Sequence, residues 1–172
     1  AMRAFLVKFK PASAAIIVPN VTFGIVHADM LEKLAAELGV KITSRHNIEY
    51  AGYQETLRSL ALKLARIEKP RLVFCLSDYS GIDVFVSQLE TQRFFPLVLT
   101  TQHLDQAIAL SGRPESYGQA YGIYPQIKDA DFSARFAARF GHAPRVYAAN
   151  GFDAVKFLAA ALSAGVDLSK PG

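Results

Sequence analysis

The stretch Ala14-Ala15-Ile16-Ile17-Val18-Pro19-Asn20 decides the fold class. Its continuous apolar run predicts a strand buried on both faces, and the Pro-Asn pair ends the strand with a turn. From Ile25 onward, apolar side chains recur at every fourth position and predict an amphipathic helix that Gly39 stops: Val26, Met30, Leu34 and Leu38. A buried strand followed by such a helix is typical of α/β proteins.

The same rhythm of strand and helix continues to Thr101. Further strands are predicted over residues 40–44, 71–76 and 96–100, and helices lie between them, with apolar faces around 57–67 and 82–89. This alternation predicts an α/β fold of three layers, α/β/α, in which the sheet is mostly parallel.

The regularity fails after Thr101. A loop is expected at 112–114, followed by an extended, aromatic-rich strand within 117–125. Asp131 is the predicted N-cap of a short helix that carries Phe132, Phe136 and Phe140, and a last helix is expected over 145–165. We therefore interpret residues 14–172 as a single ligand-binding lobe. Residues 2–13 are an N-terminal extension or an extra strand, since Phe5, Val7 and Phe9 alternate with other residues.

Composition excludes several classes of protein. The 172 residues are 51% apolar and 20% charged, and the net charge of +4 is scattered along the chain, which argues against nucleic-acid binding. No apolar run approaches the roughly 20 residues that span a bilayer, so no membrane insertion is expected.

The single cysteine, Cys75, lies in an apolar run and is expected to pack as a small hydrophobe. The cations before Ala14 superficially resemble a signal peptide, but Pro19-Asn20 interrupts the apolar stretch, so no clear signal peptide is seen.

The sequence contains no recognisable catalytic motif. No nucleophile stands in a pattern with a base, and the four histidines, at 27, 46, 103 and 142, are spread too widely for metal-ligand spacing. The loop at 19–24 has one glycine, whereas loops that cradle phosphate usually need two or three. We predict no catalytic residue, no metal and no cofactor, and therefore a protein that is not an enzyme.

Polar and aromatic residues follow the predicted strands, where open parallel sheets bind their ligands. The candidate ligand-binding residues are Phe23, Asp78, Tyr79, Ser80 and Gln102, and Thr101 and His103 stand beside the last of them. An alternative for Asp78 and Ser80 is that they only cap the helix that follows. Tyr79 better suits a ligand pocket, because its ring is amphipathic.

The order of these features resembles a known family. The features are Ile16-Ile17-Val18, Phe23-Gly24, Leu38-Gly39-Val40, the segments 53–67 and 73–81, and Gly151-Phe152-Asp153-Ala154-Val155. Together, over roughly residues 14–165, they look like the type I periplasmic solute-binding proteins, and most of all like the leucine/isoleucine/valine-binding branch that serves ABC importers.

In that family two lobes close around a solute, and this sequence corresponds to the second lobe plus the helix that returns toward the first. The resemblance implies a periplasmic component, present as a partial protein, that binds an amino acid or a related carboxylate or aromatic solute and works with an ABC permease. Tyr79 resembles the family's aromatic contact, and Phe23 stands where a tyrosine often borders the cleft. Gln102 stands where amino-acid binders often carry a glutamate for the ligand ammonium, so a neutral or anionic solute becomes plausible.

A single lobe also implies weak binding. One wall cannot bury most of a ligand, so we expect affinity of about millimolar strength or weaker, roughly 4 kcal/mol. The face left open is a candidate surface for a homodimer. Two other functions remain open: an effector-sensing domain of the same fold, and an enzyme on a doubly wound sheet that uses Asp78, Tyr79 and His103.

Overall fold

The computed structural model describes residues 1–124, 129–144 and 146–165. The chain forms two compact units, Ala1–Tyr124 and Pro125–Gly172. The prediction of one lobe over residues 14–172 spans both units and stays a prediction.

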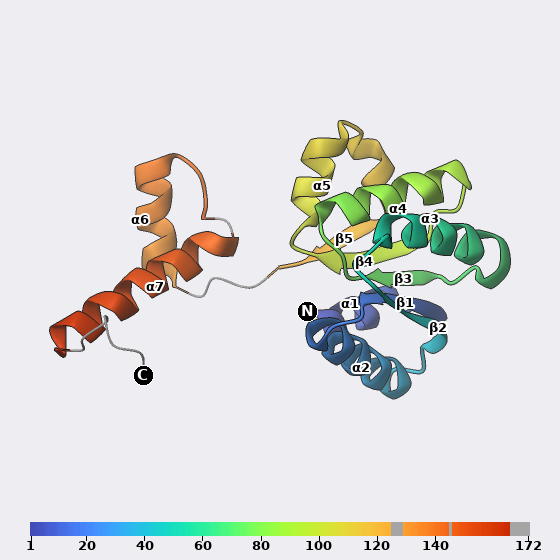
Figure 1. Cartoon of the computed structure of the whole chain (residues 1–172), viewed down its shortest axis with the longest axis horizontal. Coiled ribbons are helices and arrows are strands. Elements are labelled where there is room, and N and C mark those ends of the chain that lie inside the picture. The colour runs from blue at the N-terminus through green and yellow to red at the C-terminus, as the bar shows by residue number, and fades with distance from the viewer. Residues whose placement is uncertain (125–128, 145, 166–172) are drawn as a thin grey trace. The chain divides into compact units, whose positions relative to one another are not determined.

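The first unit is built on a sheet of five parallel strands in the order β2-β1-β3-β4-β5 (Figure 1). The strands are β1 Ser13–Pro19, β2 Lys41–Ile48, β3 Leu72–Cys75, β4 Leu97–Thr101 and β5 Ala120–Ile123. The chain passes from β1 to β2 on one side and then crosses to β3 on the other side of β1. This reversal is the topological switch point where open α/β sheets form a ligand crevice.

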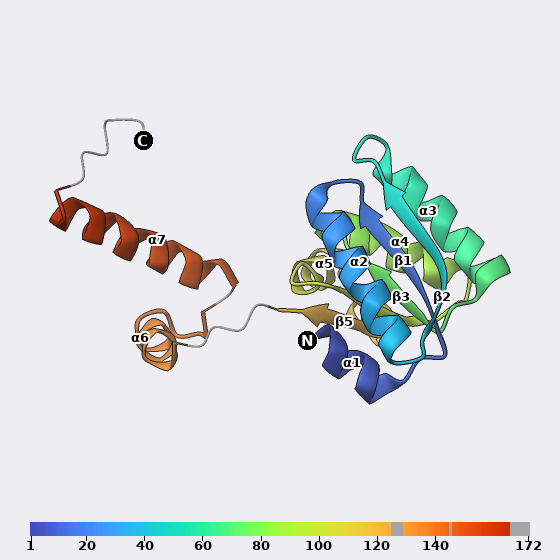
Figure 2. The same cartoon turned by 90° about the horizontal axis from the view of Figure 1, so that it is seen from below.

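Helices cover both faces of the sheet, as Figures 1 and 2 show. On one face lie α1 Met2–Phe9 and α2 Thr22–Glu37. On the other face lie α3 Tyr53–Lys63, which a π-helical turn continues over Leu64–Glu68, then α4 Tyr79–Thr91 and α5 Leu104–Ser111, and a short 3-10 turn follows at Pro114–Tyr117. The prediction of a three-layer α/β/α fold with a mostly parallel sheet is confirmed.

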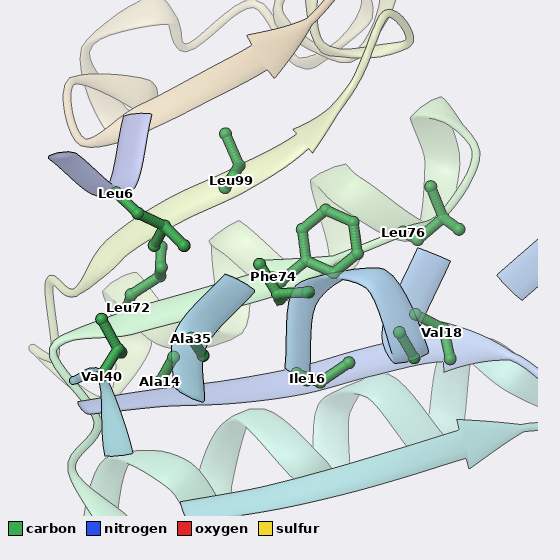
Figure 3. Close-up of a cluster of buried hydrophobic side chains, with 12 residues drawn as sticks. Leu6, Ala14, Ile16, Val18, Ala35, Val40, Leu72, Phe74, Leu76 and Leu99 are labelled. Carbon is green, nitrogen blue, oxygen red and sulfur yellow. The ribbon is translucent and has the colours of Figure 1, made fainter. Parts of the chain in front are cut away.

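Alternate residues of the central strands supply two hydrophobic cores. Ile16 and Phe74 point toward α1 and α2, where they pack with Leu6 and Leu31 (Figure 3). Ile17 and its neighbours face α3 and α4 and form the second cluster. Because both faces of β1 are buried, its sequence is continuously apolar rather than alternating.

Several sequence-based expectations are wrong in detail. Residues 2–9 form a helix rather than an extra strand, because Leu6 is buried against the sheet and Phe5 and Phe9 share one side with Tyr121. The segment after Thr101 contains α5, which the sequence analysis missed. The aromatic strand is restricted to Ala120–Ile123 within the described part of 117–125, and Tyr117 belongs to the 3-10 turn.

The second unit contains α6 Ala130–Phe140 and α7 Val146–Ser163. The helix cap is Asp129 rather than Asp131, since a carboxylate oxygen of Asp129 accepts a 2.8 Å hydrogen bond from the amide of Phe132. Phe132 packs against Phe152 with ring centroids 4.7 Å apart, and this contact joins the two helices. The expected last helix over 145–165 corresponds to α7, while residue 145 lies outside the described residues.

Candidate ligand pocket

A hollow of about 140 Å³ opens at the carboxyl ends of β1, β2, β3 and β4. It lies at the switch point of the sheet, where four loops meet. The lining residues come from all four of these loops: Pro19, Phe23, Ile48, Glu49, Tyr50, Tyr53, Leu76, Ser77, Asp78, Thr101, Gln102 and His103. Of the candidate ligand-binding residues, Phe23, Asp78 and Gln102 line this hollow, and their role in binding stays a prediction.

Phe23 enters the hollow from the first turn of α2. Its ring is 58% exposed and lies 4.3 Å, centroid to centroid, from the ring of His27. The close approach of α2 to the end of β1 depends on Gly24, because a Cβ atom there would lie 2.1 Å from the carbonyl oxygen of Pro19. Glycine at this position thus lets Phe23 stand directly over the exit of β1.

Asp78 is held by a triangle of hydrogen bonds with Tyr53 and Ser80. The Tyr53 hydroxyl lies 3.1 Å from both carboxylate oxygens of Asp78 and 2.7 Å from Ser80 Oγ, and Ser80 Oγ lies 3.1 Å from Asp78 Oδ1. Asp78 is also the N-cap of α4, where it accepts a 2.8 Å hydrogen bond from the amide of Gly81. These contacts fix the carboxylate at the edge of the hollow while leaving it exposed.

The exit of β2 supplies a second carboxylate and a second tyrosine. Glu49 accepts a 2.6 Å hydrogen bond from the side-chain amide of Asn20, which ties the loop after β2 to the loop after β1. Tyr50 is 64% exposed, and its ring meets that of Tyr53 edge to face at 6.5 Å.

The exit of β4 closes the hollow on the remaining side. The Thr101 hydroxyl donates to the carbonyl oxygen of Ser77 at 3.3 Å and accepts from the amide of His103 at 3.4 Å. One layer deeper, buried Thr100 donates to the carbonyl of Cys75 at 2.7 Å. These bonds fasten the loop that carries Gln102 and His103 to the loop that carries Asp78.

The charges of the pocket are one-sided. Glu49 and Asp78 bring two carboxylates, and none of the described lining residues is a lysine or an arginine. Phe23, Tyr50 and Tyr53 add aromatic rings, whose faces attract cations. The side chains of the site therefore favour a positively charged or neutral group over an anion, and the partial positive charge at the amino ends of α2 and α4 offsets part of this preference.

Two of the five sequence-predicted residues do not line this hollow. Tyr79 is the first residue of α4 and is 38% exposed, but it is not among the lining residues. Ser80 points to Tyr53 and Asp78 and acts as a support for them. The sequence analysis missed Glu49, Tyr50 and Tyr53. Glu49 and Tyr50 were missed because the second strand was expected to end at Ser44, whereas β2 continues to Ile48.

Cys75 is fully buried, and burial raises the pKa of its thiol to about 12, so it is a core residue. Residues 1–124, 129–144 and 146–165 hold no cluster of three or more His, Cys, Asp or Glu side chains able to bind a metal ion. Within these same ranges, no helix is both long enough and apolar enough to cross a membrane.

The fold resembles that of one lobe of the type I periplasmic binding proteins. Among solved structures, a leucine binding protein from Thermotoga maritima is similar, with a TM-score of 0.72 at 16% sequence identity, over 96% of this chain and 49% of that one. An extracellular ligand-binding receptor from Rhodopseudomonas palustris gives a TM-score of 0.72 at 19% identity, over 99% and 50% of the two chains.

A third similar structure is an ABC transporter solute binding protein from R. palustris in complex with benzoate. Its TM-score is 0.70 at 17% identity, and the match covers 98% of this chain and 48% of the other. The chain thus spans about half the length of the solved structures it resembles, which are binding proteins rather than enzymes. No family model and no curated protein matches the sequence.

Proposed function

We propose that the pocket at the carboxyl edge of the sheet binds a small solute with an ammonium group and an apolar or aromatic body, such as an amino acid. We further propose that the protein is part of the solute-binding component of an ABC importer, with a permease as its partner and a periplasmic location. The observation that carries the proposal is the gathering of two carboxylates and three aromatic rings in one hollow at the switch point.

The charge of the hollow favours the ammonium end of a solute. Judged by Gln102 alone, a neutral or anionic solute is plausible, because an amide cannot balance a cation. Asp78 and Glu49 line the same hollow, and each can accept hydrogen bonds from an ammonium group while offsetting its charge. An amino acid is therefore favoured over a simple carboxylate.

The aromatic rings favour an apolar body. Phe23 and Tyr50 are largely exposed, and covering them with a solute side chain would remove apolar surface from water. A hollow of about 140 Å³ is smaller than usual ligand pockets of about 300–1,000 Å³, so it can surround only part of a solute. Binding by this lobe is expected to be of about millimolar strength, and a tighter complex needs a second wall.

The role in import is supported by the similar structures. Those from Aeropyrum pernix and R. palustris are ABC transporter substrate-binding or solute binding proteins. An effector-sensing domain would use the same pocket, but no feature of the described residues favours sensing over import.

A titration of the full chain tests the choice of solute. Titration calorimetry should give similar dissociation constants for leucine and isopentylamine, of about millimolar strength. Benzoate is expected to bind more weakly, because it meets two carboxylates and no lysine or arginine of the described lining. Benzoate binding more tightly than leucine would overturn the assignment of an ammonium group.

The variant Asp78→Asn tests how much the charge of Asp78 contributes to leucine binding. Asparagine is as good an N-cap as aspartate, so α4 keeps its cap while the pocket loses a charge. Leucine affinity should fall about fivefold, the effect of one exposed charge pair. Glu55→Gln on the exposed side of α3 is the control and should leave the affinity unchanged. Equal affinities for both variants and the wild type would exclude Asp78 from the site.

A further inference from the structure

A second surface lies at the opposite, amino-terminal edge of the sheet, where the helices end and the strands begin. Two hollows adjoin there, of about 570 Å³ and about 340 Å³, and both are lined by Phe94, Phe95, Pro96 and Gln119. The larger, which we call the basic hollow, is also lined by Lys10, Lys69 and Arg71. The smaller, the acidic hollow, is also lined by Glu90 and Glu115.

The cations of the basic hollow are exposed, and none forms an ion pair with any described residue. Lys10 and Lys69, together with Arg93 beside Phe94, adopt the left-handed conformation with φ of 44°, 46° and 52°, where glycine is usual. Each follows the end of a helix, whose partial negative charge of about half a unit favours a cation. The helix ends therefore offset only part of the positive charge, and the hollow remains basic.

The acidic hollow has the opposite character. Glu115 is exposed, and no described residue forms an ion pair with it. Glu90 and Asp83 both contact Arg113, at 3.0 and 3.2 Å, so this single arginine offsets only one of the carboxylates on that side. The floor of the hollow is apolar, with Val86, Leu89 and Val98.

Phe95 stands on the ridge shared by the two hollows and is 64% exposed. We propose that this surface binds a second copy of the chain in a two-fold dimer, with each basic hollow facing the acidic hollow of its partner across the two Phe95 rings. A two-fold interface brings one patch onto its own copy and must therefore be self-complementary. Adjoining hollows of opposite charge on either side of an exposed aromatic ring meet that requirement.

A foreign acidic segment fits this surface less well. It would match Lys10, Lys69 and Arg71 but would meet repulsion at Glu115 on the other side of the ridge, whereas a second copy matches both hollows at once. The surface differs from the open face that the sequence analysis named as a homodimer surface, which stays a prediction. It also lies at the far end of the strands from the ligand pocket, so dimer formation and solute binding can be tested separately.

Sedimentation equilibrium of the full chain tests the proposal. A reversible dimer is expected that weakens when salt is raised from about 0.05 to about 0.5 M, because exposed charges are screened. Lys69→Glu and Glu115→Lys should each weaken the dimer about tenfold, since each change removes one charge pair on both sides of the two-fold axis. A mixture of the two variants should restore association, because one Lys69–Glu115 contact in each mixed dimer is replaced by the reversed pair.

Lys33→Glu, at an exposed position of α2, is the control and should leave association unchanged. Phe95→Ser should weaken the dimer without altering any charge. A monomer at about millimolar concentration would overturn the proposal. So would a dimer that neither salt nor Lys69→Glu affects, which would place the contact elsewhere, for example on the exposed apolar residues of α7.

Discussion

Asp78 is a helix cap and a pocket residue at once. The sequence analysis treated these as alternatives, yet the carboxylate accepts from the Gly81 amide, contacts the Tyr53 hydroxyl and still lines the hollow. A carboxylate has about four lone-pair positions, so a cap uses only part of its capacity. Capping and ligand binding therefore do not exclude each other at a strand exit.

The protonation of His46 should make the stability of the fold depend on pH. His46 lies on β2 near Lys63 and Glu68, and its Nε2 atom is buried without a hydrogen bond. Burial lowers the pKa of His46, the charge of Lys63 adds to this, and Glu68 opposes it. The folded state therefore binds fewer protons than the unfolded state below the ordinary value of 6.5.

Stability should consequently fall as the pH falls through that range. Burial raises the pKa of Glu68, but hydrogen bonds from Ser44 and Lys63 outweigh it and lower that pKa, so a further loss is expected below 4.5. Urea unfolding at about pH 8 and about pH 5.5 should show the lower free energy of unfolding at the acidic value, and His46→Gln should reduce the difference. His142→Gln, at an exposed histidine, should not reduce it. Greater stability at the acidic pH would contradict the assignment.

Sequence reasoning found the pocket residues that follow apolar strands and missed those set by tertiary contacts. Phe23, Asp78 and Gln102 were found because they follow strands with obvious apolar runs. Tyr53 was missed, since its role depends on hydrogen bonds to Asp78 and Ser80, more than two dozen positions away in the sequence.

At the scale of elements, α1 is part of the fold rather than an appendage. Leu6 is only 2% exposed and joins the core formed by β1, β3 and α2 (Figure 3), while Phe5 meets Tyr121 of β5 at 5.3 Å. The alternation of Phe5, Val7 and Phe9 is also compatible with a helix, because short apolar runs do not distinguish the two periods.

Leu6→Ala tests the contribution of α1. The substitution leaves a cavity in a closed core and should lower the free energy of unfolding by about 2–4 kcal/mol. Val7→Ala on the same helix is the control and should cost little, since Val7 is 50% exposed. Denaturant unfolding measures both variants. Equal, small losses would show that α1 does not pack on the sheet in solution.

Helix α5 is too short for the spacing of its apolar residues to predict a helix. It has eight residues, and only Leu104 and Ala107 are buried. Two buried positions do not make a recognisable stripe, so the sequence analysis expected no helix over residues 104–111. The strands β1 and β3 were found because both of their faces are buried.

At the scale of the whole molecule, topology places the site. Parallel strands all end at one edge, and the reversal of strand order between β1 and β3 leaves a crevice there without any special motif. The alternation of strands and helices made this edge predictable from the sequence. The identities of Glu49 and Tyr50 as its acidic and aromatic members were not predictable, because they depend on where β2 ends.

The chain covers 49% and 50% of the similar structures from Thermotoga maritima and Rhodopseudomonas palustris, and its hollow of about 140 Å³ is small for a ligand pocket. Weak binding is therefore the expected behaviour of this chain. A micromolar dissociation constant for monomeric protein would mean that the solute is enclosed and that the single-wall description is wrong.

The most direct test of the account is an amide NMR titration of the ¹⁵N-labelled chain with leucine. We expect chemical-shift changes that saturate at about millimolar leucine and are confined to the strand exits, at Phe23, Glu49, Tyr53, Asp78 and Gln102. No shift at saturating leucine, or shifts concentrated away from these exits, would contradict the claim that the carboxyl edge of the sheet is the solute site.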